Sequence, residues 1–267
     1  MNTINPLAVV TGASSGIGYE LARQFAEHRF DLIISAEDAA ITSVAATLAT
    51  PDTRVEAVRA DLTTAEGVEK LHRAITATRR PVAAAALNAG VGRGGPFLDT
   101  DLADELEIID LNITSTVHLA KRLLPGMVED GEGRMLITSS IASTMPGSFQ
   151  AVYNASKSFL QSFAQALQNE LKDTGVTVTS LMPGPTETEF FERADMLDTK
   201  VGRSDKDDPA QVAAQGFEAM MAGKDKVVAG SWKTKAQGLA NRVLPDSVKA
   251  QAHRGMAEPG SGTGSGS

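Results

Sequence analysis

Short apolar runs rich in valine and isoleucine recur along the chain and alternate with longer segments in which apolar residues return every three or four positions. The runs are continuously apolar, which is typical of strands buried on both faces of a parallel sheet. The longer segments have the period of amphipathic helices. The pattern predicts strands at 7–10, 31–35, 55–58, 82–87, 134–138, 176–181 and 226–228, and helices at 16–28, 38–49, 65–78, 101–129, 152–173 and 209–222.

This alternation of strand and helix predicts an α/β protein with a single-domain, doubly wound, Rossmann-type sheet of about seven parallel strands and helices on both faces. Asp208 and Pro209 suit the N-cap and the first position of the last helix. No interior segment has enough Pro or Gly to divide the chain, so residues 1–258 are expected to form one domain. Residues 259–267 are rich in Gly and Ser and are expected to be a flexible tail, left over from protein expression.

Composition narrows the classes of function. The chain has 267 residues, 42% of them hydrophobic, a net charge of -8 and no cysteine. Disulfides and thiolate chemistry are therefore excluded, and the acidic charge without a dense Lys/Arg block argues against nucleic-acid binding. No run approaches the roughly 20 apolar residues of a membrane span, and the first residues do not resemble a signal peptide. We expect a cytoplasmic protein with no membrane partner.

Four scattered histidines give no indication of a metal site. None of them forms a His-x-x-x-His pair or a cluster with carboxylates, so each is expected to be an ordinary core or surface residue. They are His28, His72, His118 and His253.

A glycine-rich turn follows the first predicted strand and leads into the first predicted helix. Without side chains, the backbone of such a turn can pass close to a pyrophosphate at the helix N-terminus. A merely tight connection between strand and helix is the alternative. The residues expected to bind a cofactor here are Gly12, Ser14, Ser15, Gly16, Ile17 and Gly18.

Tyr153 and Lys157 are four residues apart, thirteen residues or more after Ser140. On a helix, this spacing places the phenol and the ammonium on one face, one turn apart. A tyrosine has an unperturbed pKa of about 10, so a nearby cation is needed to make it an acid and base near neutrality. The three residues together predict proton transfer beside a nucleotide site.

These residues resemble the short-chain dehydrogenases/reductases, in their compact single-domain branch. The resemblance covers nearly the whole chain, from the Thr-Gly-x-x-x-Gly-x-Gly turn to the Pro-Gly-x-x-x-Thr segment. Further matches are the Asn-Ala-Gly element, the helix asparagine and the Ser plus Tyr-x-x-x-Lys set. They are carried by Thr11 to Gly18, Asn88, Ala89, Gly90, Asn112, Ser140, Tyr153, Lys157, Pro183, Gly184 and Thr188.

The resemblance implies that residues 1–258 are a dinucleotide-binding catalytic domain. Tyr153 would be the general acid/base, Lys157 would also bind the nicotinamide ribose, and Ser140 would orient the substrate oxygen. Asn112 would hold a water in a proton relay, or else it satisfies a kink in its helix. Further cofactor contacts are implied for Asp61, Leu62, Asn88, Ala89, Gly90, Tyr153, Lys157, Pro183, Gly184 and Thr188.

The cofactor choice depends on the end of the second strand. A carboxylate there can bind a ribose 2′-hydroxyl and repel a 2′-phosphate. Glu37 and Asp38 are acidic, and no basic residue lies in the glycine turn or between Leu32 and Arg54, so a 2′-phosphate is expected to meet acids and no cation. NAD(H) is favoured, with NADP(H) as the alternative; the two acids could also be ordinary residues of a first helical turn.

In the family, the segment between Ser140 and Tyr153 and the segment after Pro183 and Gly184 border the substrate. Both segments carry apolar side chains here. They suit a fairly apolar ketone or secondary alcohol, although Phe and Met at helical spacing are as often core residues. The expected substrate contacts are Ser140, Met145, Phe149, Gln150, Tyr153, Phe190 and Phe191.

The resulting hypothesis is an oxidoreductase that transfers a hydride between a nicotinamide cofactor and a ketone or secondary alcohol. The alternatives are an extended-branch sugar-nucleotide epimerase or dehydratase and a non-catalytic NAD(P)-sensing protein. Apolar residues spread around two helices more widely than one sheet contact covers, which predicts a homo-oligomer, a dimer or tetramer. They are Ile113, Val117, Ala120, Leu124, Phe159, Leu160, Phe163, Ala164, Ala166 and Leu167.

Overall fold

Seven parallel strands form one sheet in the order β3-β2-β1-β4-β5-β6-β7. The computed structural model describes residues 4–232, 234–236 and 245–263. Each strand lies within about two residues of its predicted position, so the prediction of a doubly wound α/β fold is confirmed. The strands are β1 (Leu7–Thr11), β2 (Asp31–Ala36), β3 (Val55–Arg59), β4 (Val82–Leu87), β5 (Gly133–Thr138), β6 (Val176–Pro183) and β7 (Lys226–Ala229).

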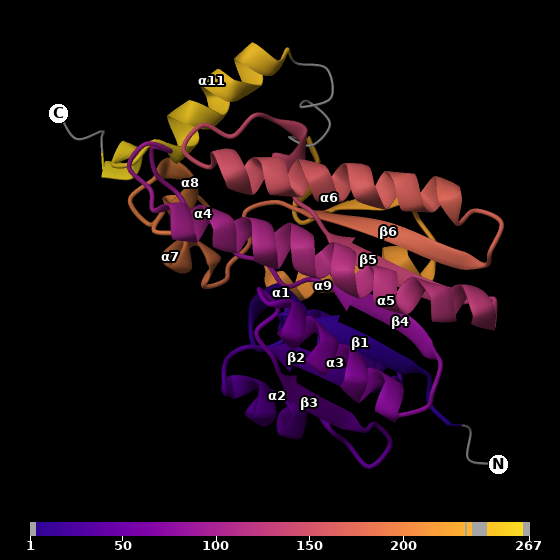
Figure 1. Cartoon of the computed structure of the whole chain (residues 1–267). Helices are drawn as coiled ribbons and strands as arrows, with labels where there is room; N and C mark the ends of the chain where they lie inside the picture. The colour runs from indigo at the N-terminus through magenta and orange to yellow at the C-terminus, as the bar shows by residue number, and fades with distance from the viewer. Residues whose placement is uncertain (1–3, 233, 237–244, 264–267) are drawn as a thin grey trace.

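Helices cover both faces of the sheet because successive side chains of each strand point to opposite sides. Ala8 and Val10 of β1 pack with α1 (Gly16–Glu27), α2 (Ala40–Leu48) and α9 (Pro209–Met221). Leu7 and Val9 pack with α3 (Ala65–Ala77), α5 (Ser115–Asp130) and α6 (Ala151–Glu170). The second set of helices lies in front of the strands in Figure 1. The long apolar runs of the sequence thus reflect two apolar cores on a single sheet.

The predicted helix at 101–129 is interrupted. It consists of α4 (Leu102–Ile108), a π-helix (Ile109–Thr114) and α5. Asn112 lies in the π-helical turn and is fully buried. Periodicity cannot reveal this wider turn, since it changes the helical register by a single residue.

Three of the helices that the structure describes after β6 were not predicted. They are α7 (Phe190–Arg193), α8 (Lys200–Arg203) and α11 (Asp246–Ala257). They gather at the carboxyl edge of the sheet, at the left of Figure 1. Lys249 of α11 donates to the Thr144 carbonyl at 3.0 Å, and the ring of Phe149 lies 5.2 Å from the Arg254 guanidinium.

The described part of the predicted tail contacts the loop that leads into α8. Gly260 N donates to the Asp198 carboxylate at 2.6 Å, and Gly262 N donates to the Asp198 carbonyl at 2.8 Å. Residues 260–262 are therefore hydrogen-bonded to the rest of the protein, which their composition did not indicate. The end of that predicted tail, 264–267, lies outside the described residues.

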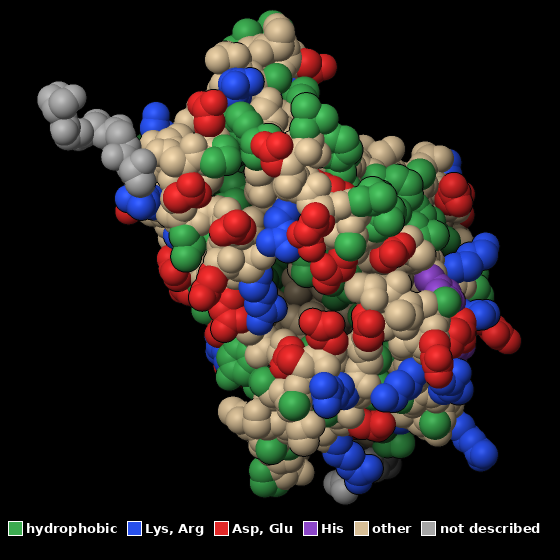
Figure 2. All heavy atoms as spheres, turned by 60° about the vertical axis from the view of Figure 1, so that its left-hand side comes forward, with side chains coloured by type: hydrophobic (Ala, Val, Ile, Leu, Met, Phe, Trp, Pro, Cys, Tyr) green, Lys and Arg blue, Asp and Glu red, His purple; other side chains and the backbone are tan. Residues whose placement is uncertain are grey.

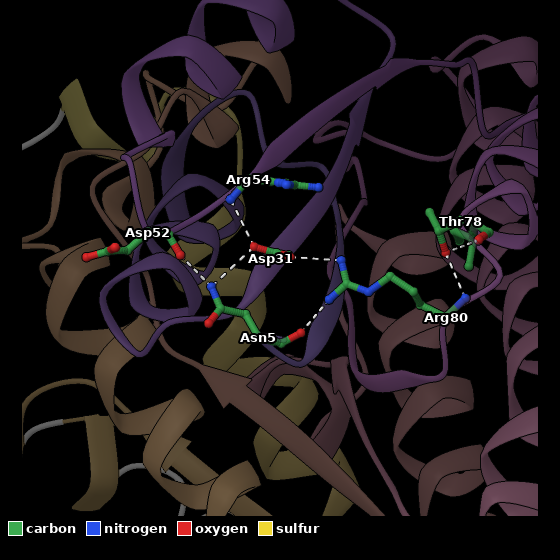
Figure 3. Close-up of polar contacts among 7 residues, drawn as sticks. Asn5, Asp31, Asp52, Arg54, Thr78 and Arg80 are labelled. Atoms are coloured by element: carbon green, nitrogen blue, oxygen red, sulfur yellow. Dashed lines mark hydrogen bonds and ion pairs between the residues drawn. The ribbon is translucent and has the colours of Figure 1, made fainter. Parts of the chain in front are cut away.

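Asp31 organises the opposite, amino-terminal edge of the sheet (Figure 3). Its carboxylate accepts hydrogen bonds from Arg54 N at 2.9 Å, Arg80 Nη1 at 2.8 Å and Asn5 Nδ2 at 3.3 Å. Burial alone would raise the pKa of Asp31, but these three donors outweigh it and lower the pKa below 3.8. One carboxylate thus joins the segments that enter β1, β2, β3 and β4.

Candidate active site

A cavity of about 930 Å³ opens at the carboxyl edge of the sheet, on the face that Figure 2 turns toward the viewer. Figure 2 shows a hollow there with acidic and basic side chains around it. The chain reverses its strand order between β1 and β4, and ligands of open α/β sheets bind at such a point. All predicted site residues line this cavity except Asn112 and Phe149.

The glycine-rich turn between β1 and α1 forms one wall. Gly16 has φ +55°, a conformation that side chains rarely adopt, and a Cβ on Gly18 would lie 1.9 Å from the Gly12 carbonyl oxygen. Ser15 is the N-cap of α1, yet its side chain makes no capping hydrogen bond and the first turn holds no acid. The first N–H groups of α1 therefore face the cavity and can bind an anion.

Threonine and asparagine side chains hold the adjacent strand ends together. Thr11 Oγ1 accepts from Asn88 N at 3.0 Å and from Ala89 N at 3.1 Å, while Thr138 Oγ1 donates to Asn88 Oδ1 at 3.1 Å. This network joins β1, β4 and β5. It fixes the loop 88–90 as a second wall of the cavity.

Ser140, Tyr153 and Lys157 come together at the centre of the cavity. Tyr153 and Ser140 share a side-chain hydrogen bond, and Ser140 Oγ accepts from Ala142 N at 3.0 Å. Lys157 lies one turn along α6 from Tyr153, with its Nζ 5.7 Å from the centroid of the phenol ring. Lys157 Nζ also donates to the Thr138 carbonyl at 3.1 Å. The helical spacing therefore places the two groups on one face, as predicted.

Burial controls the protonation of both groups. It raises the pKa of Tyr153 to about 12, although the hydrogen bond with Ser140 favours the phenolate, and it lowers the pKa of Lys157 to about 8. The expectation that Lys157 would bring the Tyr153 pKa toward neutrality is therefore wrong for this geometry. Loss of hydration outweighs a cation that lies over the ring. Tyr153 is a protonated phenol across the neutral pH range.

Asn112 does not line the cavity; its side chain is hydrogen-bonded to the loop after β4 and to α6. Its Oδ1 accepts from Val91 N at 2.9 Å, and its Nδ2 donates to the Val91 carbonyl at 3.0 Å and to Ser156 Oγ at 2.9 Å. Its side-chain amide therefore ties the loop after β4 to α6. These hydrogen bonds go to a loop and to another helix rather than to the backbone of its own helix, so both the helix-kink alternative and the water relay stay predictions.

Acidic side chains gather where β2, β3 and α4 meet the cavity. Glu37, Asp61 and Glu107 line it, and Asp61 Oδ1 accepts from Thr63 N at 2.9 Å. Burial raises the pKa of Glu107, and the charge of Glu37 raises it further. Sequence reasoning missed Glu107, because nothing in a helical pattern indicates that this residue faces a strand end 70 positions earlier.

One cation reaches the same region, contrary to expectation. Arg93 lines the cavity, but its guanidinium is paired with Asp104 at 2.8 Å. The region is therefore not free of positive charge, although Asp104 neutralises the cation. Arg59 Nε donates to the Glu37 carbonyl at 2.7 Å, outside the cavity lining.

The substrate end lies between α6, α7 and α11. Met145, Gln150, Phe190 and Phe191 line it as predicted, and the rings of Phe190 and Tyr153 are 5.2 Å apart. Phe149 is not among the lining residues: its backbone has φ +63°, and its ring lies 5.2 Å from the Arg254 guanidinium, so its contact with a substrate stays a prediction.

Several residues at this end were missed because they belong to the unpredicted C-terminal helices and loops. They include Trp232, His253, Met256 and Ala257. Within the part of the chain that the structure describes, no group of three or more His, Asp or Glu side chains is placed to hold a metal ion. The described helices also include none with the length and apolarity needed to cross a bilayer.

Comparison with known proteins identifies the family. A sequence model described as short chain dehydrogenase matches residues 6–197. The chain belongs to this family, as the motifs predicted. Sulfoacetaldehyde reductase 2 from Chromohalobacter salexigens is 34% identical over 190 residues, which cover 70% of this chain and 75% of that protein. Oxidoreductase UcpA from Salmonella typhimurium is 31% identical over 216 residues, covering 80% and 79%.

Solved structures show the same fold. A short-chain dehydrogenase from Sphingobium yanoikuyae in complex with NADPH has a TM-score of 0.78 and 27% identity, covering 84% of this chain and 87% of that one. A short-chain dehydrogenase/reductase from Burkholderia phymatum in complex with NAD has a TM-score of 0.82, 23% identity and coverages of 91% and 94%.

Proposed function

We propose that this protein is a nicotinamide-dependent oxidoreductase that interconverts a ketone and a secondary alcohol, with Tyr153 as the general acid/base. The observation that carries the proposal is the meeting of Ser140, Tyr153 and Lys157 inside the cavity that begins at the glycine turn. Family membership and the cofactors named for related structures support it.

The residues present fit a dinucleotide. A Cβ at Gly16 would lie 2.8 Å from Thr188 Cγ2, so only a glycine leaves the space beside the open N-terminus of α1. Ser14, Ser15 and Ile17 would hold the pyrophosphate, the loop 88–90 would line the path to the nicotinamide, and Lys157 would bind its ribose. When bound, the nicotinamide donates the hydride in reduction and accepts it in oxidation.

Side chains of the protein bind the substrate oxygen and supply the proton of the reaction. Ser140 and Tyr153 donate hydrogen bonds to the substrate carbonyl oxygen and hold it in place. As the carbonyl carbon is reduced, the Tyr153 hydroxyl gives its proton to that oxygen, and the phenolate left behind is stabilised by the Lys157 ammonium. The high pKa of Tyr153 keeps it in the protonated form that reduction requires.

NAD(H) is the proposed cofactor. Glu37, Asp61 and Glu107 surround the region where the adenosine ribose would lie, so a 2′-phosphate would meet three carboxylates. Arg93 offers it little, because Asp104 already pairs with that cation. The substrate is proposed to be mostly apolar, since Met145, Phe190 and Phe191 line the far end.

A homo-oligomer, a dimer or tetramer, is also proposed. Leu102 and Leu106 of α4 and Phe159 of α6 are 71%, 47% and 42% exposed, and Ile109 adds to this apolar surface. Light scattering at micromolar concentration tests it, and a strictly monomeric mass would contradict it.

Absorbance of the reduced nicotinamide, followed with a panel of ketones and secondary alcohols and with both cofactors, tests the activity. We expect cofactor oxidation by at least some apolar ketones. A non-catalytic sensor would bind the cofactor, measured by calorimetry, with no turnover of any member of the panel. An epimerase or dehydratase would instead convert a sugar nucleotide with no net change in the reduced cofactor.

A further inference from the structure

Two uncharged polar side chains, Gln150 before α6 and His253 on α11, line the cavity. Each is 7% exposed, and the neighbouring lining residues Met145, Phe190 and Met256 are apolar. In the proposed reaction, Tyr153 and Ser140 donate hydrogen bonds to the carbonyl oxygen of the substrate. The mechanism makes no use of Gln150 or His253.

His253 presents a hydrogen-bond acceptor. Its Nδ1 lies 3.0 Å from the Ser148 carbonyl oxygen, which can only accept, so Nδ1 carries the hydrogen. Burial lowers the pKa of His253, so the ring is neutral at neutral pH and Nε2 has a free lone pair. Among the described residues no group donates to Nε2, and Nε2 is not one of the enclosed polar atoms that lack a partner. Nε2 is therefore open to the cavity.

Gln150 presents both a donor and an acceptor. It follows Ser148 by two residues, so the loop that holds the His253 ring also carries this amide, and Gln150 and His253 both line the same cavity as Tyr153. Its side chain has no hydrogen-bond partner within the described parts of the chain, and neither amide atom is enclosed without one. Such an amide takes its partner from cavity water, which a bound ligand can replace.

We propose that Gln150 and His253 form a second polar subsite, which binds a hydroxyl group of the substrate away from the reacting carbon. A hydroxyl can donate to His253 Nε2 and accept from the Gln150 amide at the same time. A carboxylate would face the Nε2 lone pair without a cation of this subsite to balance it. The inference rests on the proposed function and names its substrate class as hydroxy ketones and the corresponding diols.

The His253 half of the subsite lies outside the family match, and the Gln150 half lies inside it. The family match ends at residue 197, whereas α11 spans Asp246–Ala257. Lys249 and His253 anchor α11 on the loop 144–148, at 3.0 Å each. The helix thereby adds an acceptor to a cavity whose cofactor end lies within the family match.

Matched ketones test the subsite. The probes are the meta and para isomers of hydroxymethylacetophenone, with the ethylacetophenones of nearly the same shape as references and the aminomethyl compounds as charged analogues. We expect kcat/KM to be roughly ten-fold higher for at least one hydroxymethyl isomer than for its ethyl partner, the value of about one hydrogen bond. The His253→Leu and Gln150→Leu variants should bring this ratio near one.

The measured quantity is the ratio of kcat/KM for the two ketones of a pair, because a loss of folding or of general activity lowers kcat/KM for both ketones alike. His253→Gln, which keeps an acceptor, should retain part of the preference, and Gln251→Leu, at an exposed position of the same helix, should retain all of it. A wild-type ratio near one, an unchanged ratio in His253→Leu, or a preference for the aminomethyl ketone overturns the subsite.

Calorimetric binding of the same ketone pairs separates this inference from the proposed function. Tighter binding of the hydroxymethyl ketone that is lost in His253→Leu, without turnover of any ketone, would support the subsite and contradict the reductase. Equal binding of both ketones would overturn the subsite whatever the activity.

Discussion

The two ends of the cavity are built in different ways. At the cofactor end, the walls are main-chain atoms at the ends of β1, β4 and β5, held by sheet hydrogen bonds and by Thr11, Asn88 and Thr138. At the substrate end, the short helices α7 and α8 and the separate helix α11 close the site around a small apolar cluster of Phe191, Ala194, Met196 and Ala257.

The two ends therefore differ in how strongly a substitution can change their shape and chemistry. A wall of backbone atoms keeps its shape when side chains are replaced, so the cofactor end tolerates little besides glycine at its closest contacts. A wall of side chains on loosely connected helices changes its chemistry with each substitution. We therefore expect selectivity for the substrate to depend mainly on α7, α8 and α11, and the following experiments test this division.

The largest effect is expected for replacement of Tyr153 with Phe, which should lower turnover strongly and leave cofactor binding intact. The ring keeps its packing on Phe190 but loses the proton donor, so kcat should fall by roughly 10²–10⁴-fold while the cofactor still binds. Turnover is measured by nicotinamide absorbance and the cofactor Kd by calorimetry. Tyr19→Phe, at the other tyrosine, is the control. Near-normal turnover of the Tyr153 variant would refute the mechanism.

Asp31→Asn tests whether both ends depend on the far edge of the sheet. Loss of the charged hydrogen bonds with Arg80, Arg54 and Asn5 should lower the free energy of unfolding by about 3 kcal/mol. Because the folded pKa of Asp31 is lowered, this contribution is present above pH 3.8 and is lost as the pH falls through the folded pKa.

Urea unfolding followed by circular dichroism between pH 3 and pH 7 measures this difference. Asp52→Asn is a charge-matched control nearby, since Asp52 contacts Asn5 only through its main-chain carbonyl. Equal stability of the Asp31 variant and the wild type at pH 7 would contradict the role of this network.

Lys157 lies between the two ends of the cavity. Replacement of Lys157 with Met should lower the activity and raise the free energy of unfolding. Burial lowers the pKa of Lys157 from 10.5 to about 8, so the charged form destabilises the folded state. After allowance for the lost hydrogen bond to Thr138, the variant should be about 2 kcal/mol more stable at pH 7 and much less active.

The sign of the pH dependence is specific. The lysine is charged in both states below pH 8, and between about 8 and 10.5 it is neutral only in the folded protein. The advantage of Lys157→Met in thermal unfolding should therefore shrink as the pH rises through this range. Lys172→Met, at an exposed position, should show no such trend. A destabilised Lys157 variant at pH 7 would contradict the assigned cost of burial.

Glu37→Arg should change the cofactor end alone. Removing a carboxylate and adding a phosphate partner should shift the ratio of the NADPH and NADH dissociation constants by roughly ten-fold toward NADPH. The preference among ketones should stay the same if the two ends are independent. Glu56→Arg, with the same change of charge on β3 outside the cavity lining, is the control. Comparable dissociation constants for both cofactors in the wild type at low salt would contradict the NAD(H) assignment.

The division between the ends also explains what the sequence could predict. Most strands are continuous apolar runs because both of their faces are buried, and the helices that cover them are periodic because each buries one apolar face against the sheet. The glycine turn and the Ser140, Tyr153 and Lys157 set depend on local spacing. α11 has a weak pattern with only His253 and Ala257 buried, so its presence depends on tertiary contacts with the loop 144–148.

Two electrostatic features were beyond sequence reasoning for a different reason. The pKa of Tyr153 is determined mainly by burial, and the pKa of Glu107 is raised by burial and by the charge of Glu37, a residue 70 positions earlier in the chain. Neither burial nor contact between distant segments can be read from the spacing of residues along the chain.

The π-helical turn at Ile109–Thr114 gives the chain one place where its length can change without moving the cavity wall. A π-turn holds about one residue more than an α-turn. Deleting one residue here would therefore convert the wide turn into an α-turn and leave α4 and α5 facing nearly the same way, so Asp104 and Glu107 would stay on the cavity wall. The same deletion inside α5 would instead rotate the two parts of that helix against each other by about 100°. Between Leu102 and Asp130, the π-helical turn is thus the point at which a single-residue deletion would do least harm to the cofactor end.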